Sequence, residues 1–111
     1  MSADKVFHPV GDAAAFPAND VRGVSIAGAG VDGGNLGIAV GRSGDNFFAV
    51  ARRCPHAGGD LAQGIVSRGD LVCPHHHWCF STTTGQHDSL ASMCIATYAV
   101  RVRDGIVEVG L

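Results

Sequence analysis

The sequence has few basic residues and no long apolar run, and each absence excludes a class of protein. Its 111 residues include 8 Lys and Arg against 10 Asp and Glu, for a net charge of −2. Proteins that bind nucleic acid need a surplus of basic side chains to neutralise phosphates, so no nucleic-acid partner is expected. A helix that crosses a membrane needs about 20 consecutive apolar residues. No such stretch is present, so no membrane contact is expected.

The start of the chain lacks the layout of a secretory signal. "MSADKVFHPVGDAAAF" has no charged segment followed by an apolar one. We therefore expect a protein of the cytoplasm, where thiols stay reduced. Under those conditions the 4 cysteines are better explained as metal ligands than as disulfides.

Strand patterns dominate the remaining sequence. The composition, 46% hydrophobic and 16% charged, suits one folded domain over residues 1–111. "TYAVRVRDGIVEV" predicts a β-hairpin that turns at Asp104 and Gly105. Other short strands are expected at residues 6–10, 21–26, 36–40, 47–51, 65–66 and 70–72. The helical signal is limited to one capped turn at residues 12–16. This pattern is typical of an all-β protein, here a small antiparallel sandwich or barrel.

The stretch "GAGVDG" (residues 28–33) matches the dinucleotide-binding motif G-x-G-x-x-G. That motif binds a pyrophosphate only where a helix begins at its end. Here Gly33 is followed by Gly34, Asn35 and Gly37, which disfavour a helix. A loop that joins two strands is therefore the favoured interpretation.

Two short clusters carry the residues most able to do chemistry. "CPH" contains Cys54 and His56, and "CPHH" contains Cys73 and His76. A proline within each cluster and several glycines nearby predict that both are loops. Thiolate and imidazole together suit zinc or an iron–sulfur centre and exclude magnesium and calcium.

Two kinds of metal centre are open at this point. Two cysteines and two histidines can close a tetrahedral zinc site, which would be structural. Zinc sites, however, usually place both cysteines on one knuckle and both histidines on a helix, whereas here each loop has one of each. If Cys54 and Cys73 bind one iron while His56 and His76 bind another, the set is that of a Rieske [2Fe–2S] centre.

The wider sequence resembles small Rieske-type ferredoxins over about residues 47–110. The spacing C-x-H-x16-C-x2-H stands within "CPHAGGDLAQG" and "GDLVCPHHHWCFSTTTG", and "YAVRVRDGIVEV" follows. The resemblance implies an antiparallel β-sandwich or barrel base. It also implies a small cluster-binding subdomain made of two loops, at about residues 52–82, with a [2Fe–2S] cluster as cofactor.

The resemblance further implies a one-electron carrier, not an enzyme. Its partners would be a flavin- or NAD(P)H-linked reductase and a terminal oxygenase, such as an aromatic-ring dioxygenase. The alternative is a small electron-entry subunit of a larger reductase, such as assimilatory nitrite reductase. We expect a monomer.

Differences from high-potential relatives predict a low reduction potential. Those relatives have a further cysteine in each loop, where this chain has Gly59 and His75, and a hydroxyl where it has Trp78. Fewer hydrogen bonds to the cluster sulfurs predict a potential toward the low end of the range of about −150 to +300 mV. The x2 spacing selects His76 as the ligand, so His75 and His77 are expected to face solvent. His77 also stands where family members usually have Gly.

The residues around the signature have expected supporting roles. Trp78 and Phe80 are expected to cover the cluster and exclude water. Cys79 and Cys94 are expected to pack as small apolar side chains. Three charged residues near the first loop are expected to be solvated: Arg52, Arg53 and Asp60.

Overall fold

The computed structural model describes residues 6–28, 31–53, 60–74, 79–86 and 95–111. Its strands are β1 (Phe7–Asp12), β2 (Asp20–Ile26), β3 (Leu36–Ser43), β4 (Asn46–Ala51), β5 (Ile65–Ser67), β6 (Asp70–Val72), β7 (Cys79–Ser81), β8 (Thr97–Arg103) and β9 (Ile106–Gly110). Short 3-10 helices are η1 (Ala13–Ala15), η2 (Val31–Gly33) and η3 (Leu61–Gln63). No helix in these ranges has the length and apolar character needed to cross a membrane.

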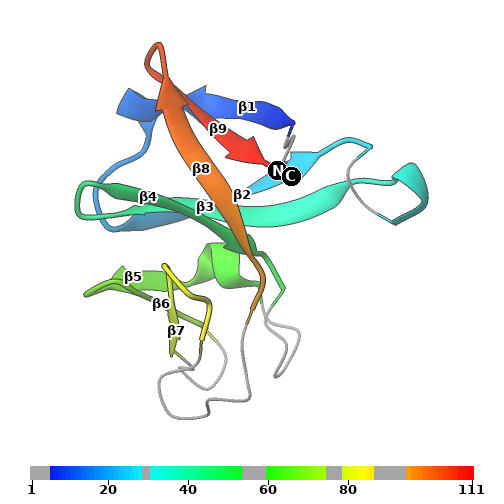
Figure 1. Cartoon of the computed structure of the whole chain (residues 1–111). Helices are drawn as coiled ribbons and strands as arrows, with labels where there is room; N and C mark the ends of the chain where they lie inside the picture. Colours follow the sequence, from blue (N-terminus) through cyan, green and yellow to red (C-terminus); the bar gives the residue numbers. More distant parts are fainter. Residues whose placement is uncertain (1–5, 29–30, 54–59, 75–78, 87–94) are drawn as a thin grey trace.

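The strands form two antiparallel sheets. The larger has six strands in the order β1-β9-β8-β4-β3-β2, and the smaller has three in the order β5-β6-β7. The large sheet curls on itself, and the small sheet and η3 lie against one of its faces (Figure 1). We call β5, β6 and β7 together with η3 the small unit. This arrangement confirms the predicted antiparallel base with a small additional unit.

Two hairpin turns have positive φ at both central residues, as the right-handed twist of the flanking strands favours. Between β8 and β9, Asp104 and Gly105 have φ of 52° and 76°, which confirms the predicted turn. Between β5 and β6, Arg68 and Gly69 have φ of 52° and 82°. The second turn is harder to predict because Arg rarely adopts positive φ.

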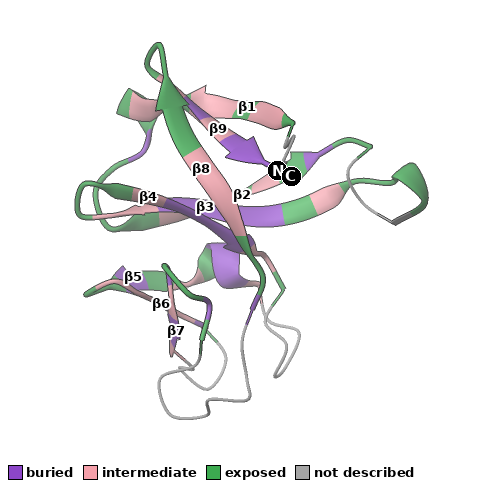
Figure 2. Cartoon of the chain, viewed as in Figure 1, coloured by how far each residue is buried: buried purple, intermediate pink, exposed green. Residues whose placement is uncertain are grey.

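Both faces of the large sheet are buried along β3 and β4. Ile38 and Val40 pack inside the curled sheet with Val107 and Val109. Alternate residues of the same strands, such as Ala39, point to the opposite face and pack under the small unit. The buried residues of β3, β4 and η3 are purple in Figure 2. Burial on both faces explains why "IAV" and "FFAV" are continuous apolar runs and not alternating ones.

Several local features differ from the sequence predictions. β7 is an additional strand within the segment that was expected to consist of two loops. The turn predicted at residues 12–16 forms as η1, but the Asp12 side chain makes no capping hydrogen bond. Between β2 and β3, the described part of the glycine-rich stretch contains η2 and no α-helix, so the loop interpretation holds there.

Candidate metal centre

The two segments that carry the predicted ligands are closed at their bases by β-pairing. Arg53 and Asp60, which flank residues 54–59, form an antiparallel bridge. Val72 and Cys79, which flank the second segment, are partners in the β6–β7 ladder. Leu61, which follows the first pairing, and Phe80, which follows the second, belong to the same buried cluster. Residues that border both ligand segments therefore pack in one core cluster between the two sheets.

Cys73 is the predicted ligand that the structure describes. It directly follows β6, and its exposed fraction is 0%. It packs in the same buried cluster as Leu61, Leu71 and Ile95. A thiol held away from water next to a turn, with a histidine three positions later in the sequence, has the donor chemistry of an iron–sulfur ligand. The thiol of Cys73 is therefore a donor of the kind that the predicted cluster requires.

The other predicted ligands, Cys54, His56 and His76, lie outside the described residues. The same is true of the residues with expected neighbouring roles: Gly59, His75, His77, Trp78 and Cys94. Within the described ranges no three His, Cys, Asp or Glu side chains come together as a metal site. The ligand set as a whole therefore stays a prediction from the sequence.

An ion pair lies beside the base of the first segment. Arg52 Nε donates to Asp60 Oδ1 at 2.9 Å, and Nη2 donates to Oδ2 at 3.0 Å. The Arg52 hydrogen bond lowers the pKa of the Asp60 carboxyl below its usual value, while partial burial acts in the opposite direction. Arg52 and Asp60 thus remain partly exposed, as expected, but they pair with each other, which the sequence did not indicate, and Arg53 is exposed.

Backbone N–H groups of η3 donate to the same two residues. Leu61 N–H donates to the Arg52 carbonyl at 2.7 Å, and Ala62 N–H donates to Asp60 Oδ1 at 3.0 Å. Asp60 is thus the N-cap of η3, whose Leu61 and Ala62 are buried. An aspartate directly before a short apolar turn is a recognisable N-cap signal. The stretch "GGDLAQG" therefore indicates the N-cap, but it does not indicate that Asp60 pairs with Arg52.

Phe80 and Cys79 occupy different environments on β7. Phe80 has an exposed fraction of 0% and belongs to the core between the sheets. Its observed role is to hold the small unit on the large sheet, and whether it also covers a cluster stays a prediction. Cys79 is partly buried, in agreement with a packing role.

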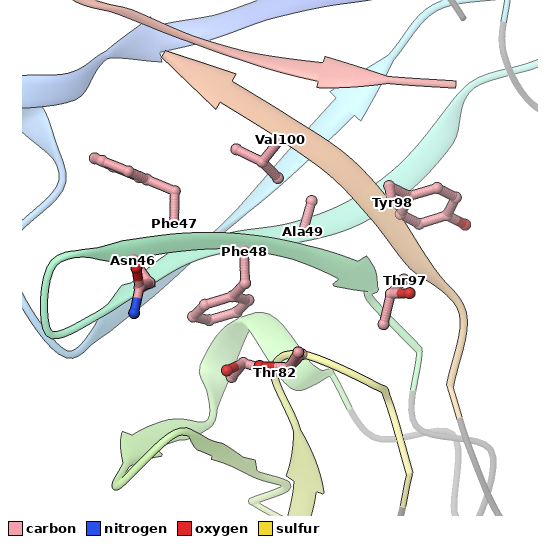
Figure 3. A pocket seen from close by; sticks show the side chains of 9 residues that line it. Asn46, Phe47, Phe48, Ala49, Thr82, Thr97, Tyr98 and Val100 are labelled. Atoms are coloured by element: carbon pink, nitrogen blue, oxygen red, sulfur yellow. The ribbon is translucent and has the colours of Figure 1, made fainter. Parts of the chain in front are cut away.

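An open cavity of about 230 Å³ lies between the large sheet and the turn after β7. Figure 3 shows Phe48 pointing from β4 toward Thr82 at this place. Thr82 Oγ1 donates to the Gly69 carbonyl at 2.9 Å. The described lining residues include no thiol, imidazole or carboxylate, so this cavity is not the metal centre.

Comparison with known families decides between the two kinds of centre. A family model for the Rieske [2Fe-2S] domain matches residues 6–99. The chain belongs to this family. Membership of the Rieske family implies a [2Fe–2S] cluster as cofactor, and the match includes both ligand segments and most of the large sheet.

Individual Rieske proteins show how far the likeness extends. The ferredoxin subunit of anthranilate 1,2-dioxygenase from Burkholderia cepacia is 34% identical over 84 residues, which are 70% of this chain and 73% of that protein. A chain in the complex of reduced oxygenase and oxidized ferredoxin in carbazole 1,9a-dioxygenase is 27% identical. It superposes with a TM-score of 0.82, covering 96% of this chain and 94% of that one.

A third relative matches a shorter part of the chain. Apoptosis-inducing factor 3 from Homo sapiens is 46% identical over 39 residues, which are 35% of this chain but 6% of that protein. The chain therefore spans only a small part of the length of this relative.

Proposed function

We propose that this chain is a one-electron carrier whose Rieske cluster is held by Cys54, His56, Cys73 and His76. In this assignment Cys54 and Cys73 bind one iron, and His56 and His76 bind the other. When bound, such a cluster accepts and releases a single electron. Core packing beside the two segments supports the assignment, because Leu61, which follows the first, and Phe80, which follows the second, pack in one cluster with the buried Cys73.

The electron route follows from the relatives. We propose that the chain takes electrons from a flavin- or NAD(P)H-linked reductase and passes them to a terminal oxygenase. The ferredoxin subunit from Burkholderia cepacia, which matches 70% of this chain, supports this role.

We further propose that residues 1–111 form a single domain, with residues 52–82 as its cluster-binding unit, and that the carrier works as a monomer in the cytoplasm. Reduced thiols there keep Cys54 and Cys73 available as ligands. The histidine-bound iron is the proposed end for electron exchange. Imidazoles at a loop tip offer a shorter path to a partner than buried thiolates such as Cys73.

The function can be tested with protein prepared without oxygen. We expect acid-labile sulfide, two irons per chain (the [2Fe–2S] stoichiometry) and electron paramagnetic resonance in the reduced state. Reduced protein should transfer one electron to a partner oxygenase in stopped-flow mixing. His76→Ala should abolish the signal, whereas His75→Ala and His77→Ala should retain it. Co-purification with a large reductase subunit would instead support an electron-entry subunit, and a colourless zinc protein would overturn both.

A further inference from the structure

The two ligand segments are closed at their bases in different ways. The second is closed by a backbone ladder, since β6 and β7 pair at three successive positions, ending at Val72 and Cys79. The first is closed by the single bridge between Arg53 and Asp60. The first base thus has less backbone pairing than the second, and the Arg52–Asp60 side-chain pair adds to the hydrogen bond from Leu61 N–H to the Arg52 carbonyl there.

Arg52 lies across the outer face of the large sheet. A methyl group built on Gly23 of β2 would approach the Arg52 guanidinium carbon and Nη1 at 2.5 Å. One built on Gly37 of β3 would meet the Arg52 Cδ at 3.6 Å, an ordinary contact. Gly23 lies opposite Ala39, and Gly37 lies opposite Ser25, in the β2–β3 ladder. The missing side chain at Gly23 therefore provides the space in which the guanidinium sits.

In this position beside Gly23, the Arg52 guanidinium faces the Asp60 carboxylate. From it, Arg52 makes both of its hydrogen bonds to the carboxylate, at 2.9 and 3.0 Å. Asp60 in turn caps η3, whose Leu61 and Ala62 are anchored in the core between the sheets. The large sheet, the ion pair and η3 thus form one connected support beside the segment that contains Cys54 and His56.

We propose that Arg52 is a positioning residue for the cluster, which acts through Asp60 to hold the base of the 54–59 segment in place. This inference rests on the proposed ligand set. Both side chains are more than one-third exposed, so the pair adds little to global stability. Its effect should instead be local, on how firmly Cys54 and His56 retain iron and on the electronic environment of the cluster.

Gly23→Ala tests this without changing either member of the pair. The three atoms nearest the added methyl group all belong to the Arg52 guanidinium, the end of a flexible side chain, so the strand should fold normally while the guanidinium moves away from Gly23. Gly37→Ala is the matched control, because it adds the same group to the neighbouring strand in ordinary contact. Asp60→Asn removes the carboxylate charge with little change in side-chain shape. Arg52→Lys keeps the positive charge but loses the bidentate hydrogen bonding to Asp60.

Iron release from the oxidised holoprotein to excess chelator is the first measurement. We expect release about tenfold faster or more in Gly23→Ala and Asp60→Asn, intermediate release in Arg52→Lys, and the wild-type rate in Gly37→Ala. The double variant Gly23→Ala with Asp60→Asn should release iron no faster than either single variant, since both substitutions disrupt the same Arg52–Asp60 contact. Loaded Gly23→Ala and Asp60→Asn should also show shifted g values and a shifted reduction potential. Their thermal unfolding, followed by far-ultraviolet circular dichroism, should differ only slightly from that of Gly37→Ala.

Three results would overturn the proposal. Wild-type release rates in both Gly23→Ala and Asp60→Asn would show that the pair does not support the ligands. Equal acceleration in Gly37→Ala would assign the effect to general weakening of the sheet. A wild-type protein without a [2Fe–2S] resonance signal would overturn this inference together with the proposed function, whereas the first two results would leave that function standing.

Discussion

Val72 lies directly opposite Cys79 in the β6–β7 ladder, immediately before and after the segment that begins with Cys73. The pairing fixes where that segment leaves and re-enters the small sheet. The Cys73 side chain, at 0% exposure, lies in the core cluster between the two sheets. One ligand of the proposed cluster is therefore part of the hydrophobic core, and removing it should affect metal binding directly.

Cys73→Ser should abolish cluster binding. A serine hydroxyl is a poor iron ligand at neutral pH compared with a thiolate, and this side chain lies where water cannot substitute for it. Iron and acid-labile sulfide per chain should fall to near zero, with loss of visible absorption. Cys79→Ser is the control, because Cys79 lies outside the ligand pattern and should keep the wild-type content. Wild-type iron and sulfide in Cys73→Ser would contradict the assignment.

Leu71→Ala should weaken the contact between the two sheets. Leu71 has 0% exposure in the core cluster, and emptying such a site costs about 2–5 kcal/mol of unfolding free energy. Ile65→Ala, on the neighbouring strand, removes a side chain that is 66% exposed and should change stability by no more than about 0.5 kcal/mol. Denaturant unfolding of both variants measures the difference. Equal losses would show that the small unit is not anchored through Leu71.

Acid should remove the stabilising effect of the Arg52–Asp60 pair. The pKa of Asp60 is lowered in the folded protein, so its contribution is complete above the unfolded value of about 3.9. It is lost as the pH falls through the lower folded value. For a pair this exposed the contribution is at most about 1 kcal/mol.

Asp60→Asn checks this pH dependence. The variant should be less stable than wild type at pH 6, and the difference in unfolding free energy should shrink as the pH approaches 3. A difference that stays constant over that pH range would show that Asp60 acts through its shape alone.

The reduction potential should lie toward the low end of the Rieske range of about −150 to +300 mV. Position 59 is Gly and position 75 is His, so the two further loop cysteines of high-potential relatives are absent. Trp78 replaces the hydroxyl that would donate to a cluster sulfur. Potentiometric titration measures the midpoint, and a value above about +200 mV would contradict this account of tuning.

Much of the large sheet could be predicted because its signals are local. The turn at Asp104 and Gly105 requires positive φ at both positions, and the adjacent strands alternate visibly. β7 was missed because three residues after a histidine tract carry too little pattern to indicate a strand. It forms because Phe80 fills the core between the sheets, which is a tertiary effect.

The spacing of the proposed ligands could be recognised from the sequence, but the Arg52–Asp60 pair beside them could not. Arg52 and Asp60 are eight positions apart and look like ordinary surface charges. Their pairing depends on the open space at Gly23, about thirty positions earlier, and no local pattern joins these three residues.

The central claim is that two unlike irons are held by one chain, one by Cys54 and Cys73 and the other by His56 and His76. Mössbauer spectroscopy of the oxidised protein, enriched in iron-57, tests it most directly, because both irons are then ferric and a difference between them reports their ligands. We predict two distinct iron sites in equal amounts, one typical of sulfur ligation and one of nitrogen ligation. Two identical sulfur-ligated sites, or a protein that binds zinc and no iron, would contradict the claim.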